Sequence, residues 1–171
     1  MEMNDERVIR ADRDTVWAAL LSPEVLKECV SGAQEVTGSP EEGFAATVVQ
    51  KVGPVKATFK GTVTLSDMIQ GESLTLSGEG KGGAAGFARG GARVTLADVD
   101  EGATRLTYAV EAKVGGKLAQ LGSRLIDSFA KKMADQFFER FQEALEGAED
   151  TDVPAADDEK PKGWFRKLRG K

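Results

Sequence analysis

The sequence contains no histidine and a single cysteine, so it lacks most of the side chains on which enzyme chemistry commonly depends. Without histidine there can be no Ser–His–Asp triad, no imidazole base and no histidine metal ligand. One cysteine, Cys29, cannot form an internal disulfide and leaves too few ligands for a zinc site. We therefore expect a buried structural thiol in a reducing, cytoplasmic setting, and a protein that is not an enzyme.

Long apolar runs are also missing. No stretch approaches the ~18 consecutive apolar residues that would span a membrane, and the acidic opening MEMNDERV has no apolar segment, so we expect no secretory signal. The chain carries 28 acidic and 23 basic residues, for a net charge of −5. This acidic balance argues against nucleic acid as the main partner.

The most pronounced pattern in the chain is one long amphipathic stretch, from Lys117 to Leu145, that contains no proline. Its apolar residues recur at every fourth position: Leu121, Leu125, Phe129, Met133, Phe137, Phe141 and Leu145. This spacing predicts a helix of about eight turns, whose apolar face winds around the axis because four residues exceed one turn by ~40°. Such a face suits a helix that lies diagonally across a curved sheet.

The residues before this helix predict the sheet. Asn4–Ala11 is expected to be a strand, followed by two short helices that Asp12 and Ser22 cap. From about residue 33 the pattern changes to alternation, most clearly between Val55 and Ser66. One strand, two short helices, about six antiparallel strands and one long helix indicate an α+β helix-grip fold, in which a curved sheet wraps around the C-terminal helix.

Small side chains dominate the predicted inner face of the sheet: Ala46, Ala57, Gly61, Gly78, Gly80, Gly90, Ala92 and Ala112. Either they let the helix approach closely, or they leave a hydrophobic cavity, which suits a lipid-like ligand because unpaired polar atoms would lower affinity. The predicted ligand cavity is lined by Phe44, Val48, Phe59, Gly61, Val63, Leu76, Gly78, Leu106, Tyr108, Val110, Leu125, Phe129, Met133 and Phe137.

The glycine-rich stretch Gly80–Gly91 does not have the spacing of a phosphate-binding loop and precedes a strand, so we expect its glycines to bend the sheet. Tyr108 and Gln50 are the inward-facing polar candidates, and each is more typical of a satisfied core group than of a catalyst. No pair of inward carboxylates is apparent, which leaves the catalytic set empty.

The chain divides into a helix-grip domain (1–146), an acidic disordered linker (147–162) and a basic amphipathic tail (163–171). Basic residues interleaved with Trp, Phe and Leu are typical of a segment that binds an anionic membrane surface reversibly. The predicted membrane-binding residues are Lys160, Lys162, Trp164, Phe165, Arg166, Lys167, Leu168, Arg169 and Lys171. A solubilising tail, a tail folded back on the linker, a nucleic-acid-binding peptide and docking onto a protein remain open.

Four stretches carry a family resemblance: VGPVKATFKGTVTL (52–65), LSGEGKGGAAGFARGGARV (76–94), VGGKLAQLGSRLID (114–127) and KKMADQFFERF (131–141). They resemble the CoxG-like family, named after the G subunit of carbon monoxide dehydrogenase, which belongs to the START/Bet v 1-like (SRPBCC) superfamily of helix-grip proteins. The resemblance extends over about residues 3–145 and does not include the tail.

The resemblance implies an accessory protein of a molybdenum-containing carbon monoxide dehydrogenase or a related soluble oxidoreductase, attached peripherally to the inner face of the cell membrane. The superfamily implies a cavity for a hydrophobic small molecule. Together with the residue patterns, this predicts a protein without covalent cofactor or metal that binds an isoprenoid quinone such as menaquinone and links the enzyme to the membrane. The alternatives are a closed-core recruitment adaptor without ligand and a cyclase- or hydrolase-type enzyme of the same superfamily.

Overall fold

The computed structural model describes residues 1–152. A first strand, β1 (Glu2–Ile9), is followed by the short helices α1 (Arg13–Leu20) and α2 (Pro23–Cys29). Six strands come next: β2 (Ala33–Ser39), β3 (Gly43–Val52), β4 (Val55–Ile69), β5 (Ser73–Lys81), β6 (Phe87–Asp98) and β7 (Thr104–Gly115). A 3-10 segment, η1 (Gly83–Ala85), joins β5 to β6, and a second, η2 (Gly116–Leu121), leads into the long helix α3 (Ser123–Asp152).

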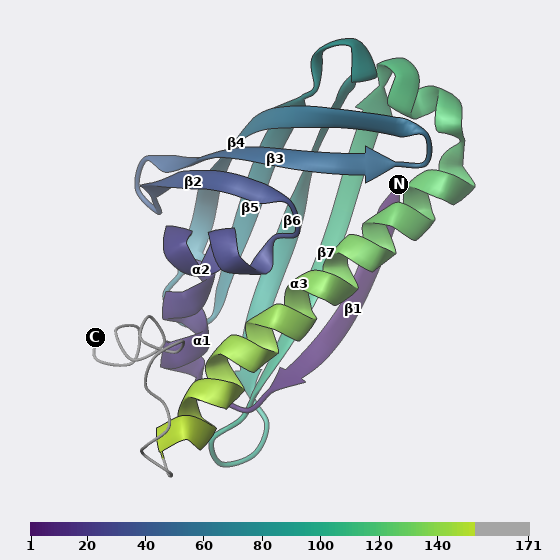
Figure 1. Cartoon of the computed structure of the whole chain (residues 1–171). Helices are drawn as coiled ribbons and strands as arrows, with labels where there is room; N and C mark the ends of the chain where they lie inside the picture. The colour runs from purple at the N-terminus through teal and green to yellow at the C-terminus, as the bar shows by residue number, and fades with distance from the viewer. Residues whose placement is uncertain (153–171) are drawn as a thin grey trace.

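The seven strands form one antiparallel sheet in the order β1-β7-β6-β5-β4-β3-β2. The sheet is strongly curved, and α3 lies diagonally across its inner side (Figure 1). This is the predicted α+β helix-grip arrangement. The alternation of β4 is also confirmed, because Val55, Phe59 and Val63 are half-buried while the lysines and threonines between them are exposed.

Both short helices begin where the sequence predicts. The Asp12 carboxylate accepts a hydrogen bond from the Thr15 backbone N–H at 2.9 Å, and the Ser22 hydroxyl accepts one from Val25 N–H at 3.3 Å. Pro23 occupies the first helical position, where no N–H is required. These caps place α1 and α2 together at one end of the sheet.

The predicted bounds of two elements, the first strand and the long helix, are wrong. The first strand is Glu2–Ile9 and not Asn4–Ala11. The long helix does not begin at Lys117, because residues 116–121 form η2 and Gly122 then turns the chain with a φ of 93°, a left-handed conformation that favours glycine. At its other end α3 continues to Asp152, through the first six residues of the predicted acidic linker. The rest of that linker, 153–162, and the predicted tail, 163–171, lie outside the described residues.

The core is divided between the two ends of the molecule. The larger cluster packs β1, the central strands and α1–α2 against the C-terminal half of α3, and Phe141, Ile9, Leu74 and Leu106 are almost completely buried there. The smaller cluster lies at the opposite end, around Val52, Leu118 and Ile126. The N-terminal half of α3 therefore packs against far less of the sheet than its C-terminal half does.

Candidate ligand cavity

A cavity of about 660 Å³ lies between the inner face of the sheet and α3. This volume is within the ~300–1,000 Å³ typical of small-molecule sites, and far above the ~150 Å³ of an engineered apolar cavity that stays dry and binds benzene. Strands β3 to β7 supply one wall and α3 the other, with residues of α1 and α2 at one end and Leu118 of η2 at the other. Apolar side chains make up nearly all of the lining.

Most of the predicted cavity residues lie on this wall. The structure brings together Phe44, Val48, Phe59, Val63, Leu76, Leu106, Tyr108, Val110, Phe129, Met133 and Phe137. Many of these apolar side chains, including Phe59, Met133 and Phe137, are only half-buried because part of their surface faces the cavity. Whether they contact a ligand stays a prediction.

Three predicted residues do not line the cavity: Gly61, Gly78 and Leu125. A β-carbon at Gly61 would lie 2.6 Å from the Glu79 carbonyl oxygen, so this glycine permits close approach of two strands instead of opening space. At Gly78 the same β-carbon would lie 3.2 Å from a backbone oxygen and from the Val63 side chain. Leu125 reaches the β3–β4 turn, where a β-carbon on Gly53 would approach its Cδ2 to 2.8 Å, and Ile126 lines the cavity in its place.

The small inner residues thus have two different roles. Ala46, Gly80, Ala88, Ala92 and Ala112 line the cavity. A β-carbon at Gly80 would meet no atom within 4 Å, whereas one at Gly90 would lie 2.1 Å from the Glu111 carbonyl oxygen. Of the two interpretations left open by the sequence, close helix approach or a cavity, the cavity accounts for the first group. Gly61 and Gly90 follow neither interpretation, because each permits the close approach of a neighbouring strand.

Sequence reasoning missed the residues that enclose the two ends of the cavity. Leu20, Leu21, Leu26 and Val30 contribute from α1, α2 and the residues that follow them. Met1 and Met3 contribute from the start of the chain and β1, Val114 from the end of β7 and Leu118 from η2. The apolar face of α1 and α2 was a usable signal, because helices this short must bury their apolar residues against something. The sequence does not show that the space beside them is hollow.

Two polar side chains, those of Gln50 and Tyr108, lie among the apolar residues of the wall. The Gln50 amide donates a hydrogen bond to the Ser31 carbonyl, which ties β3 to the α2–β2 connection. The Tyr108 ring is buried and stacks on Phe138 with 5.3 Å between ring centroids. Gln50 is therefore a hydrogen-bonded core group and Tyr108 a packed one. Among the described residues, neither is hydrogen-bonded to a carboxylate in the way that acid–base catalysis would require.

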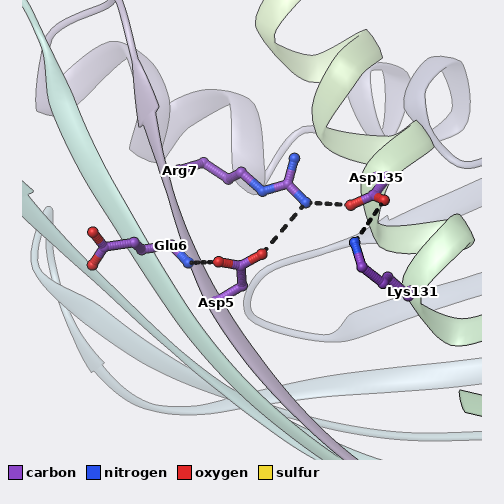
Figure 2. A network of polar contacts seen from close by, with 5 residues as sticks. All are labelled: Asp5, Glu6, Arg7, Lys131 and Asp135. Carbon is purple, nitrogen blue, oxygen red and sulfur yellow. Dashed lines mark hydrogen bonds and ion pairs between the residues drawn. The ribbon is translucent and has the colours of Figure 1, made fainter.

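An ion-pair network fastens α3 to the edge strand β1 beside the cavity (Figure 2). The Arg7 guanidinium donates to the Asp135 carboxylate at 2.6 Å, and Lys131 donates to the other carboxylate oxygen at 3.1 Å. Arg7 also lies over the ring of Phe138, 5.1 Å from its centroid. Further along, the Gln142 amide donates to the Val8 carbonyl at 3.1 Å. These contacts join α3 to β1, the edge strand of the sheet.

The Asp135 contacts predict a pH-dependent contribution to stability. Hydrogen bonds from Lys131 and Arg7 hold the pKa of the Asp135 carboxyl below its ordinary value. Because the folded-state pKa is the lower one, the stabilisation is present above the unfolded-state pKa of about 3.9 and is lost as the pH falls through the folded-state value. Asp135→Asn should therefore lower the free energy of unfolding at pH 7, by no more than about 1 kcal/mol since the carboxylate is solvent-screened.

Urea unfolding at pH 7 and at pH 3 measures this effect. The difference between wild type and Asp135→Asn should shrink at the lower pH, because the stabilisation from a carboxyl whose pKa is lowered in the folded state decreases once the pH falls below the unfolded-state value. A matched substitution, Asp127→Asn, removes the same charge from an exposed position of α3 and should change little at either pH. An equal loss for both variants at both pH values would contradict the network's role.

Cys29 is buried in the larger core cluster, which confirms the expected structural thiol. Burial away from water, with a smaller effect of Glu28, raises the pKa of this thiol to about 12, so it stays protonated at neutral pH. A protonated, inaccessible thiol is a poor nucleophile. Among residues 1–152, no group of three or more acidic or cysteine side chains is placed to hold a metal ion.

The sequence matches the family model for the G subunit of carbon monoxide dehydrogenase (CoxG) over residues 6–146, which is most of the chain. The chain belongs to the CoxG family. CoxG is a family of accessory subunits, and the match includes every strand that lines the cavity except the first residues of β1. No curated protein matches this CoxG-family chain.

Solved structures share the fold of this CoxG-family member. A conserved protein from Geobacillus kaustophilus is 25% identical with a TM-score of 0.81, covering 86% of this chain and 97% of that one. A START superfamily protein from Mycobacterium smegmatis is 10% identical with a TM-score of 0.64, covering 85% of this chain and 97% of that one. A Thermus thermophilus protein is 15% identical with a TM-score of 0.65, covering 86% and 99%. These likenesses show that the CoxG-family chain shares its fold with these proteins, a START superfamily protein among them.

Within the described part of the CoxG chain, the helices fall short of the combined length and apolarity that crossing a bilayer would require.

Proposed function

We propose that this protein is a non-catalytic accessory subunit that carries an isoprenoid quinone, such as menaquinone, between the cytoplasmic membrane and a carbon monoxide dehydrogenase-type or related oxidoreductase. The single observation that supports the proposal most strongly is the 660 Å³ apolar cavity between the sheet and α3. The redox chemistry belongs to the partner enzyme. The protein contributes a dry compartment in which an apolar electron acceptor can leave the membrane.

The lining of the cavity favours an uncharged, mostly apolar ligand. Among the described residues, no charged side chain lines it, and burying an ion without a partner is strongly unfavourable. An isoprenoid chain, in contrast, gains ~0.8 kcal/mol for each buried methylene-sized group. Fatty-acid and phosphate-bearing lipids are correspondingly disfavoured, because the described lining offers no cationic side chain to their head groups.

The wall suits the long apolar body of an isoprenoid quinone. Gln50 and Tyr108 belong to a lining whose inner surface is almost entirely apolar, so hydrogen bonding adds little to the selection of a ligand. Phe59, Phe129 and Met133 offer flat or flexible apolar surfaces. A ligand with an apolar body and few polar groups therefore matches the wall better than a hydroxylated one.

The closed-core adaptor is the weaker alternative. It requires helix packing to fill the space above the small inner residues, yet the β-carbon position of Gly80 faces open space. Membrane recruitment by the basic tail is compatible with both functions and rests on the sequence of residues 160–171. Under either function the salt dependence of vesicle binding should be steep, since screening acts on exposed charges.

Extraction and mass spectrometry of the gently purified protein test the proposal. We expect close to one quinone or other isoprenoid for each chain after purification from a quinone-containing host, and uptake of menaquinone from liposomes by the stripped protein. A protein that is empty on purification and takes up no quinone from liposomes would remove the carrier function and leave the adaptor. Co-purification of an anionic lipid in its place would show that the head-group argument is wrong.

A further inference from the structure

Basic residues are concentrated where three chain connections meet at one end of the molecule. These are the β3–β4 turn, the β5–β6 connection with η1, and the β7–α3 connection with η2, which together with the flanking strand residues (51–60, 79–89 and 111–124) we call the basic end. The smaller apolar cluster joins the first and the third, because Val52, Val55, Val114 and Leu118 all belong to it. The second lies beside both, because η1 contacts β4 and η2. Figure 1 shows η1, η2 and the start of α3 on this side of the sheet.

The basic end holds eight basic side chains, all exposed: Lys51, Lys56, Lys60, Lys81, Arg89, Lys113, Lys117 and Arg124. It contains two acidic residues, Glu79 and Glu111, of which Glu79 lies 3.9 Å from Lys81. The connections themselves read VGPVK, GGAAG and GGKLAQL and include no acidic residue. Their tips, Gly53–Pro54, Ala84 and Ala119, are exposed, small and uncharged.

The opposite end of the sheet has the reverse charge. Residues 12–14, 67–72 and 98–102 hold seven acidic residues and one basic residue, Arg13. Arg13 joins these segments, with its side chain 3.2 Å from both the Asp98 carboxylate and the Gly71 carbonyl oxygen. The folded body is therefore electrically polar along its length, with an excess of positive charge at one end and of negative charge at the other.

We propose that the basic end is a docking surface for an anionic lipid bilayer, formed by the folded domain itself and independent of the tail. An anionic leaflet attracts the basic end and repels the acidic end, so it orients the body as well as binding it. At ordinary ionic strength the attraction acts only within about 10 Å of the membrane surface. Charges at the end of the domain that is close to the lipid therefore contribute to binding, and charges at the far end do not.

Several features favour a bilayer over a nucleic acid or an acidic protein. The small uncharged tips between the lysines can enter a head-group region without bringing a carboxylate into it. The cavity also reaches this end, where Met1, Val52 and Leu118 line it. Docking by the basic end would place the end of an apolar compartment beside lipid, an arrangement that serves neither nucleic-acid binding nor protein recognition. This last step rests on the proposed carrier function, whereas the charge argument does not.

Charge-neutralising variants of the full chain test the surface. Binding to phosphatidylcholine vesicles with and without about 30% phosphatidylglycerol, an anionic lipid, would be compared for Lys56→Gln/Lys81→Gln/Lys117→Gln and for a control, Lys27→Gln/Lys132→Gln/Arg140→Gln. The control removes the same charge from exposed positions on α2 and α3 outside the basic end. We expect roughly a tenfold or greater loss of affinity for anionic vesicles in the first variant and less than about threefold in the control. Equal losses would overturn the proposal.

A second measurement reports orientation and separates the domain from the tail. Ala84→Cys at the basic end and Asp100→Cys at the acidic end are exposed positions that take a fluorescent label, while buried Cys29 does not compete. A lipid-borne quencher should quench the Ala84 label and spare the Asp100 label. Preferential quenching at Asp100, or equal quenching at both positions, would show that the basic end does not face the bilayer.

Two further outcomes would also overturn this proposal. Quinone uptake tests the carrier function and not the docking surface. If vesicle binding is the same for both triple variants while binding of a short DNA duplex is lost only in the first, the basic end binds polyanions and not membranes. If the tail alone anchors the chain, both labels stay unquenched. A protein that fails these tests but co-purifies with a quinone would refute the docking surface and leave the carrier function intact. A protein that passes them but neither contains nor takes up a quinone would support the docking surface and refute the carrier function.

Discussion

Replacing Gly80 by leucine should abolish quinone uptake while leaving the protein folded. A β-carbon at this position meets no atom within 4 Å, so the new side chain extends into the cavity without displacing backbone. We expect at least a roughly tenfold loss of menaquinone uptake from liposomes, because each displaced methylene of ligand contact is worth ~0.8 kcal/mol. The free energy of unfolding should stay the same or rise by up to ~1 kcal/mol, since glycine weakens a strand interior.

The matched control is Ala109→Leu, which adds a leucine side chain on the outer, exposed face of β7. This variant should retain uptake. Urea unfolding of both variants and mass spectrometry of extracted quinone provide the two readouts. Normal quinone binding by a folded Gly80→Leu protein would mean that the quinone binds outside this cavity. Gly61→Leu is unsuitable for the test, because its β-carbon would meet the Glu79 carbonyl oxygen at 2.6 Å and damage the sheet itself.

Replacing Phe141 by alanine should cause the largest loss of stability of any alanine substitution in the described side chains of α3. Its ring is completely buried, stacks on Phe137 at 5.5 Å and meets Phe138 edge-on at 6.3 Å. Removing a fully packed Phe typically costs ~3–5 kcal/mol because a cavity is left behind. Against a typical total of about 5–15 kcal/mol, such a loss would be measurable as a large shift in the urea midpoint.

Phe129→Ala provides the comparison on the same helix. This ring lines the existing cavity and is only half-buried, so its removal enlarges a space that is already present. We expect a loss of at most about 2 kcal/mol, from the partial transfer of the ring to water. Equal losses for Phe129→Ala and Phe141→Ala would contradict the division of the helix into a packed half and a cavity-facing half.

The fold could be predicted from sequence because its signals are local. The strict alternation in β4, the capping residues Asp12 and Ser22 and the four-residue apolar spacing of α3 each report on a few neighbouring residues. The start of α3 could not be predicted in this way. An apolar pattern continues smoothly from Leu118 through Leu121, and only the left-handed conformation of Gly122 shows that the chain turns there.

The cavity was only partly predictable, for a different physical reason. Alternation identifies which residues of a strand face inward, and it therefore placed Phe44, Phe59 and Val63 correctly on the wall. Alternation does not show how closely two strands approach. Gly61 and Gly80 are partners in the β4–β5 register and look alike in the sequence, yet a β-carbon would meet backbone at Gly61 and open space at Gly80. The contribution of Leu26 and Val30 depends on how α2 packs across the sheet, a long-range arrangement that no local pattern encodes.

The length and direction of α3 limit which parts of the chain can contact a membrane at the same time. The helix starts at the basic end and runs for 30 residues towards the acidic end, a distance of roughly 45 Å. Residues 153–162 can reach at most about 36 Å when fully extended. If α3 stands perpendicular to the membrane, residues 163–171 and the basic end therefore cannot contact the same leaflet at the same time. Either α3 is inclined to the membrane surface, or the protein alternates between two bound states. In one state the tail holds the chain to the membrane, and in the other the basic end brings the cavity to the lipid.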